Sequence, residues 1–154
     1  MEIDYKEQNI VKEFISLARI DCASRDERKV ADYLISILKE LGCEVYEDNA
    51  GKETEGNTGN IHAVLKGDLN GSVLFMAHMD RVQNGIGIMP VIKDNKLYSD
   101  GSTILAADDL SGVVAILDGL RKIKESKKPH VDVEVVFSVC EEIGLKGSLY
   151  LDIE

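Results

Sequence analysis

Five residues of this chain combine a side chain that can bind a divalent cation or move a proton with a position where a predicted strand ends or a predicted helix begins. They follow two apolar runs or begin a predicted helix, and they are His78, Asp80, Asp108, Glu141 and Glu142. Each signal is weak by itself, because carboxylates are common at helix starts and on the surface of an acidic chain. In open α/β sheets, however, ligands bind beyond the carboxyl ends of the strands. We therefore expect these residues to converge on one site although they lie far apart in the sequence.

Together these side chains suit a site for two divalent cations. A neutral imidazole from His78 is a good zinc ligand, and Asp80, two residues later, could orient that ring. Asp108 could bridge both ions with its two oxygens, and Glu142 would hold the second ion. Glu141 is then left as an unligated carboxylate that takes a proton from water, which is the general-base role.

The elements that position these residues follow from hydrophobic periodicity. Helices are predicted at 10–18, at 24–41 and from Asp108 or Asp109, as N-cap, to about Lys122. Ser24 and Glu27 have the spacing of a capping box for the second of these helices. Strands are predicted at 43–47, 61–66, 72–77, 91–93, 96–99 and 131–139, and an exposed loop at 48–60.

Two features of the strands decide the expected fold. The segment 67–71 is dense in turn formers, so we predict a hairpin between the strands that flank it. The run from Val73 to Ala77 does not alternate, as expected of a strand that is covered on both faces. Strands mixed with covering helices indicate an α/β domain, built on a mixed sheet with helices on both faces.

The composition excludes several classes of function. The chain has 18 Lys plus Arg against 28 Asp plus Glu, a formal charge of −10, so we expect no nucleic-acid partner. Even the longest apolar runs, such as 73–77, are too short to cross a bilayer, and the acidic start lacks the features of a secretion signal. We therefore expect a cytoplasmic protein with no membrane partner. The three cysteines, Cys22, Cys43 and Cys140, share no CxxC spacing and are expected to be buried thiols.

Several strings of the sequence resemble the two-zinc aminopeptidase, carboxypeptidase and deacylase superfamily. They are Gly59-Asn60-Ile61, Ala77-His78-Met79-Asp80, the stretch from Asp100 to Asp109, Ser111-Gly112, and the stretch from Glu141 to Gly147. Their order and spacing are those of the superfamily, and they cover nearly the whole chain. Gly-Ser-Thr-Ile-Leu at 101–105 and Glu-Glu-Ile-Gly-Leu-Lys-Gly at 141–147 look most like peptidase T, the tripeptide aminopeptidase group.

Carried over residue by residue, the resemblance makes His78 a ligand of one metal, Asp108 the bridging ligand and Glu142 a ligand of the other. It makes Glu141 the general base and Asp80 the residue that holds His78. The implied cofactor is a pair of divalent metal ions, with zinc expected and cobalt or manganese as alternatives.

The resemblance also implies a cis peptide bond between Asp108 and Asp109. Two positions depart from the pattern, because Leu110 and Ala106 stand where many relatives have Lys and Gly. Neither is an expected ligand, so these departures bear on substrate detail and leave the metal site intact.

The family pattern requires further residues beyond the glutamate pair. Relatives add an acidic ligand after it and a last histidine near a more distant C-terminus, usually with a lid domain between. His130 and Asp132 are of the right types, but about 30 Å of strand separates them from Glu141 at the usual rise per residue. We therefore expect residues 1–154 to be the N-terminal part of the catalytic domain, without the lid domain and the C-terminal part.

The resemblance implies hydrolysis of the N-terminal peptide bond of short peptides by the full-length parent, with the fragment itself inactive. A deacylase or carboxypeptidase of the same superfamily is one alternative, because the residues that separate these reactions lie outside the chain. A noncatalytic α/β binding module, such as a receiver-like domain with an acidic magnesium site, is the other. The exact substrate and the oligomeric state, a homodimer included, stay open.

Overall fold

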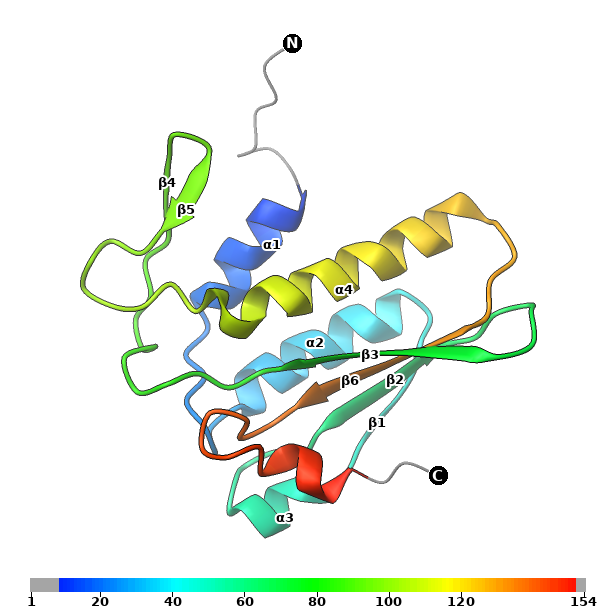
Figure 1. Ribbon diagram of the computed structural model, residues 1–154, viewed down its shortest axis with the longest axis horizontal. Coiled ribbons are helices and arrows are strands. Elements are labelled where there is room, and N and C mark those ends of the chain that lie inside the picture. Colours follow the sequence, from blue (N-terminus) through cyan, green and yellow to red (C-terminus); the bar gives the residue numbers. More distant parts are fainter. Residues whose placement is uncertain (1–8, 152–154) are drawn as a thin grey trace.

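A four-stranded sheet forms the centre of the structure, a computed structural model that describes residues 9–151 (Figure 1). Its strands, in spatial order, are β1 (Glu44–Glu47), β2 (Ile61–Leu65), β6 (Asp132–Ser138) and β3 (Ser72–His78). β2 is antiparallel to β1 and β6, whereas β3 is parallel to β6. A separate hairpin pairs β4 (Val91–Lys93) with β5 (Lys96–Tyr98). The expected mixed sheet is confirmed.

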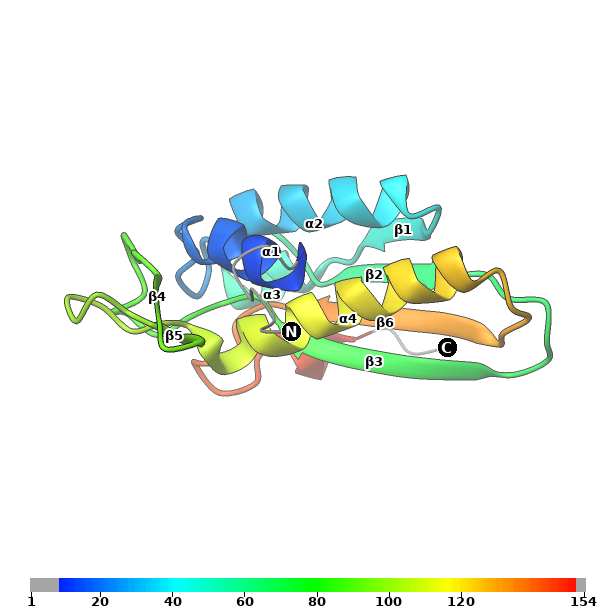
Figure 2. The same ribbon diagram turned by 90° about the horizontal axis from the view of Figure 1, so that it is seen from above.

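The helices cover this sheet unevenly. The long helices α1 (Asn9–Ala18), α2 (Arg28–Glu40) and α4 (Ala107–Ser126) lie on one face (Figure 1 and Figure 2). The short helix α3 (Ala50–Thr54) and the 3₁₀ helix η2 (Gly147–Tyr150) lie on the other side in Figure 1, toward one end of the sheet. The core fills the space between the long helices and alternate residues of the strands. The α/β fold class predicted from the sequence is confirmed.

The predicted hairpin at 67–71 is wrong, because β6 lies between β2 and β3. Phe137 of β6 is opposite Ile61 on one side and Ala77 on the other. The turn formers serve a different purpose, since the backbone amide of Gly67 donates to Asp132 Oδ1 at 2.8 Å. A Cβ at Gly67 would collide with the carbonyl of the nearby His130. The segment therefore passes closely over the start of β6 and closes no hairpin.

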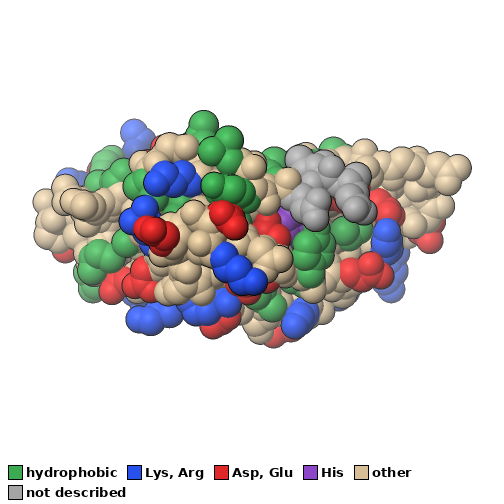
Figure 3. Space-filling model, turned by 90° about the horizontal axis from the view of Figure 1, so that it is seen from below, with side chains coloured by type: hydrophobic (Ala, Val, Ile, Leu, Met, Phe, Trp, Pro, Cys, Tyr) green, Lys and Arg blue, Asp and Glu red, His purple; other side chains and the backbone are tan. Residues whose placement is uncertain are grey.

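The pattern of β3 predicted a strand covered on both faces, and this prediction is wrong. β3 is an edge strand among the described residues, and its side chains from Val73 to Met76 are 39% to 47% exposed. Only Ala77 and His78, at its carboxyl end, are buried. The face seen from below likewise shows hydrophobic side chains exposed among charged ones (Figure 3). The described residues place no further strand beside β3, which is why the prediction of a buried strand fails here.

The predicted capping box is also wrong. α2 begins at Arg28, and Glu27 occupies the N-cap position without a side-chain capping hydrogen bond. Ser24 Oγ instead donates to Asp80 Oδ2 at 2.6 Å, and Glu27 is completely buried. Both side chains are thus engaged by partners that are distant in sequence. The predicted exposed loop at 48–60 is wrong in part, because it contains α3 and the buried Thr54, which bonds the carbonyl one turn earlier.

The start of α4 positions one of the candidate residues. Asp108 and Asp109 have non-helical backbone dihedrals, and the peptide bond between them is cis, as the resemblance implied. Asp109 Oδ1 accepts a hydrogen bond from the Gly112 amide at 3.1 Å, which is the contact of an N-capping carboxylate. A side chain at Gly112 would collide with that carboxylate. Asp109 therefore caps the regular part of the helix, and Asp108 is left to project toward the strands.

Two further expectations concern the thiols and the membrane. Cys22, Cys43 and Cys140 are free and buried, as predicted. None of the helices among residues 9–151 combines the length and the apolar character that a bilayer crossing requires.

Candidate metal centre

The parallel pairing of β3 with β6 brings two candidate segments together at the carboxyl ends of these strands. His78 is the last residue of β3 and lies opposite Ser138, the last residue of β6. Glu141 and Glu142 follow β6 directly, and Asp108 reaches the same region from the start of α4. The convergence expected from the sequence is therefore present in the structure.

The imidazole of His78 is largely buried, with 9% of the side chain exposed, and its two nitrogens face different partners. Nδ1 lies 3.0 Å from the backbone oxygen of Asp80 and 3.5 Å from Asp80 Oδ1. Nε2 lies 3.1 Å from Asp108 Oδ1 and 3.7 Å from Glu141 Oε2. With the ring proton on Nδ1 donated to the Asp80 carbonyl, the lone pair of Nε2 faces the carboxylates. This is the usual arrangement of a histidine that ligates a metal.

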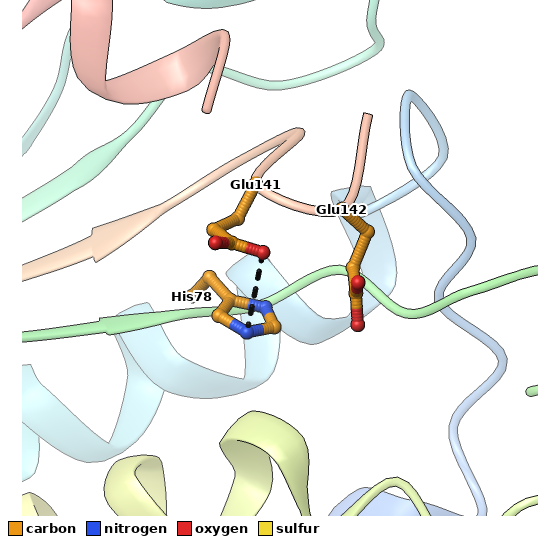
Figure 4. A group of neighbouring side chains, drawn as sticks. All are labelled: His78, Glu141 and Glu142. Carbon is orange, nitrogen blue, oxygen red and sulfur yellow. Dashed lines mark ion pairs between the residues drawn. The ribbon is translucent and has the colours of Figure 1, made fainter. Parts of the chain in front are cut away.

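The donor atoms around Nε2 suit a divalent cation. One ligand atom from each of His78, Glu141 and Glu142 lies within 4.8 Å of the others. Figure 4 shows the Glu141 carboxylate directed at the imidazole ring and the Glu142 side chain extending alongside it, both from the segment after β6. Asp108 adds a carboxylate whose side chain is 86% exposed, so its second oxygen is open to another partner. An imidazole with several carboxylates is a donor set that fits zinc and similar divalent metals.

The electrostatics of the centre favour a bound positive charge. Burial alone lowers the pKa of His78, but the hydrogen bonds to Asp80 and Asp108 outweigh it and raise this pKa to about 9. Burial raises the pKa of Glu142, and the Asp108 and Asp80 carboxylates raise it further although His78 opposes them. The raised pKa of His78 shows that these carboxylates stabilise a positive charge beside the ring, and a metal ion would compete with the proton for the same imidazole nitrogen.

The carboxylate of Asp80 is buried and holds the backbone of the glutamate pair. Oδ1 accepts from the Glu141 amide at 2.8 Å, and Oδ2 accepts from the Glu142 amide at 3.1 Å and from Ser24 Oγ at 2.6 Å. Burial raises the pKa of Asp80, but His78, Ser24 and these amides bring it below its ordinary value. The sequence assigned Asp80 to holding His78, and that role stays a prediction. The structure adds a second role, because the carboxylate lies closer to the two amides than to the ring.

The individual roles of the other candidates also stay predictions. The structure brings His78, Asp108, Glu141 and Glu142 together, and both glutamates lie near the imidazole. The division into His78, Asp108 and Glu142 as ligands and Glu141 as base is tested by the experiments below. Ser24 was missed by sequence reasoning, because its spacing to the next glutamate fits a helix cap equally well.

The other two histidines lie away from this centre. His62 Nε2 contacts Asp48 Oδ2 at 3.0 Å, and its ring stacks on Tyr46 with centroids 4.4 Å apart. His130 Nδ1 contacts the Val131 backbone oxygen at 2.7 Å, just before β6 and thus at the opposite end from the glutamate pair. Both have structural partners, and neither contributes to the candidate centre.

Comparisons with known proteins find peptidases. Residues 60–152 match the model of peptidase family M28. The aminopeptidase PepT of Bacillus cereus has a TM-score of 0.89 and 37% identity, with 93% of this chain and 39% of that chain covered. A tripeptidase of Staphylococcus aureus also has a TM-score of 0.89, with 35% identity and 95% and 40% covered. The uncharacterized protein YqjE of Bacillus subtilis is 34% identical over 147 residues, 95% of this chain and 40% of its own length. The chain thus spans about 40% of the length of these relatives, and the resemblance stated from the sequence is confirmed.

Proposed function

The chain belongs to peptidase family M28, and we propose that it is the N-terminal part of the catalytic domain of a tripeptide aminopeptidase that uses two divalent metal ions. The full-length protein would hydrolyse the N-terminal peptide bond of short peptides. The two similar solved structures are an aminopeptidase and a tripeptidase, which supports this reaction. The observation that carries the proposal is the cluster of an imidazole and carboxylates at the carboxyl ends of β3 and β6.

In this proposal each side chain has one role. His78 would offer Nε2 to one metal, Asp108, whose carboxylate is exposed, would serve both metals, and Glu142 would hold the other. Bound divalent ions would polarise the scissile carbonyl and lower the pKa of water. Glu141 takes the proton from that water and passes it to the leaving amine, as a general base and then acid. Its carboxylate stands 3.7 Å from Nε2 of His78, close enough to serve the same reaction centre.

Zinc is the metal we propose, with cobalt or manganese as alternatives, because imidazole and carboxylate ligands suit it. Within this chain one metal would have His78 and Asp108 as ligands, and the other would have Asp108 and Glu142. A catalytic zinc normally has three protein ligands. We therefore propose that the remaining ligands and a lid belong to parts of the longer relatives that this chain does not span, and that the chain alone binds zinc weakly and is inactive.

The cellular location, the partners and the assembly of the protein are part of the same proposal. We propose a cytoplasmic enzyme that acts on short peptides, with neither nucleic acid nor a membrane as partner and with a homodimer as its candidate assembly. The net charge of −10 and the free buried cysteines support this setting. The similarity to an aminopeptidase and a tripeptidase favours this reaction over deacylase or carboxypeptidase action and speaks against a noncatalytic receiver-like module.

Zinc titration of the 154-residue chain tests the proposed centre directly. Calorimetry should detect zinc binding by the wild-type chain and its loss in His78→Ala. His130→Ala is the matched control, because it removes a histidine at the other end of β6. Equal binding by His78→Ala and wild type would place the metal elsewhere and remove the proposed centre. Tripeptide hydrolysis by a full-length parent, assayed with and without a chelator, then tests the reaction itself.

A further inference from the structure

Four consecutive backbone amides, those of 139–142, donate hydrogen bonds to side chains from three other segments. In chain order the acceptors are Asn60 Oδ1 at 3.0 Å, Glu27 Oε1 at 3.1 Å, Asp80 Oδ1 at 2.8 Å and Asp80 Oδ2 at 3.1 Å. Asn60 and Glu27 are completely buried, and Asp80 is 1% exposed. The path of the chain between β6 and the glutamate pair is thus fixed by buried side chains and not by secondary structure.

Cys140 is the residue at which this path turns. Its φ of +54° lies in the left-handed region, which residues with a Cβ rarely adopt without support from their surroundings. Glu27 Oε1 contacts both the amide of Cys140 and, at 3.5 Å, its Sγ. The next residue is Glu141, so the turn at Cys140 decides where both glutamate side chains point.

Glu27 is an unusual residue to find in this position. Its carboxyl is completely buried, Oε2 has no hydrogen-bond partner among the described residues, and burial raises its pKa. A buried carboxyl with an unsatisfied oxygen is costly. Capping of α2 does not explain why Glu27 is buried here, because its side chain makes no capping hydrogen bond. The carboxyl interacts instead with the backbone of Arg25, just before the helix, and with the amide and thiol of Cys140.

We infer that Glu27 is a positioning residue that holds the Cys140 amide and thereby directs Glu141 and Glu142 toward His78. Ser24 assists through Asp80, because the oxygen that accepts its hydroxyl also accepts the Glu142 amide. The Ser-x-x-Glu string at the start of α2 therefore serves the candidate centre. The consequence for metal binding rests on the proposed function, whereas the effect on the backbone does not.

Amide hydrogen exchange of the 154-residue chain, resolved by NMR, tests the backbone effect. Glu27→Met keeps a similar volume but offers no acceptor, so the amides of Cys140, Glu141 and Glu142 should exchange at least about tenfold faster. Glu27→Gln keeps an acceptor oxygen and should restore slow exchange. Glu13→Met is the matched control, because Glu13 is a buried glutamate on α1 that pairs with Arg121 away from this turn. It should lower the melting temperature without selectively exposing these amides.

Zinc affinity and a second variant complete the test. Zinc should bind about tenfold more weakly to Glu27→Met, the usual cost of losing a residue that orients metal ligands, and normally to Glu27→Gln. Ser24→Ala, a milder change, should speed exchange mainly at Glu142 and keeps the test decisive if Glu27→Met does not fold. Wild-type exchange at all three amides in Glu27→Met would overturn the inference, as would equal effects of Glu27→Met and Glu13→Met there. A wild-type chain without zinc affinity would defeat the proposed function alone, since the exchange data still decide the role of Glu27.

Discussion

The substitution Asp80→Asn should destabilise the chain strongly although it changes little in shape. Asn keeps Oδ1 as an acceptor for the Glu141 amide, but it places an NH₂ group where Oδ2 now accepts from Ser24 Oγ and from the Glu142 amide. The Ser24 hydroxyl can rotate and become the acceptor, whereas the Glu142 amide cannot. Loss of one hydrogen bond to a carboxylate costs roughly 1.5–3 kcal/mol, and an amide left without a partner falls in a similar range. We therefore expect the free energy of unfolding to fall by about 3 kcal/mol.

Urea denaturation followed by circular dichroism at neutral pH measures this difference. Asp132→Asn is the matched control, because Asp132 also accepts a backbone amide, that of Gly67 at 2.8 Å, but lies at the far end of β6. It should have a smaller effect and leave zinc affinity unchanged, whereas Asp80→Asn should also weaken zinc binding. The reasoning fails if Asp80→Asn stays within about 0.5 kcal/mol of wild type, the range of an ordinary surface substitution.

The remaining predictions concern catalysis, pH and association. In the full-length parent, Glu141→Gln should retain both metals and lose two or more orders of magnitude in rate, roughly the value of a general base. Glu142→Gln should instead lose one metal and recover in part with excess zinc; metal analysis beside the turnover number decides, and the opposite pattern would exchange the two roles. The raised pKa of Glu27 predicts that the stability it contributes in its protonated form is present below its unfolded pKa of 4.5 and is lost as the pH rises through the higher folded value. Urea unfolding across this range should show wild type losing stability relative to Glu27→Gln, and parallel curves would contradict this. The exposed edge strand predicts self-association of the chain at high concentration, which Phe75→Lys should reduce and Val91→Lys, at a comparably exposed position on β4, should not; sedimentation velocity that shows monomers throughout would refute it.

Local pattern was enough to predict the elements that carry the candidate residues. The helical period of Ile10 to Ala18 and the apolar end of the strand at 131–139 reappear as α1 and β6 almost residue for residue. The convergence of His78 with the glutamate pair could also be predicted from the sequence. It requires only that the carboxyl ends of two neighbouring parallel strands lie side by side. These predictions succeed because amphipathic periodicity and strand direction are local properties of the chain.

Most of the predictions that failed depended on partners distant in sequence. A turn-rich segment at 67–71 is compatible with a hairpin, and nothing within it reveals that β6 takes the place between the two strands. The apolar run at 73–77 indicates what a strand can bury, but the described residues leave most of it exposed. The loop at 48–60 contains α3, whose five residues are too few to show a helical period.

The same distinction separates the residues that form the candidate centre from those that position it. His78, Asp108 and the glutamate pair are recognisable because metal ligation and proton transfer need particular side-chain types, and the sequence displays those types directly. The role of Glu27 requires only a buried acceptor oxygen beside the turn at Cys140, and that condition depends on where the residue before α2 meets the segment after β6. Ser24 and Glu27 resemble a capping box because both arrangements use polar side chains that form hydrogen bonds with backbone amides. Whether Glu27 accepts a hydrogen bond from an amide of its own helix or from one 113 residues away depends on the tertiary fold.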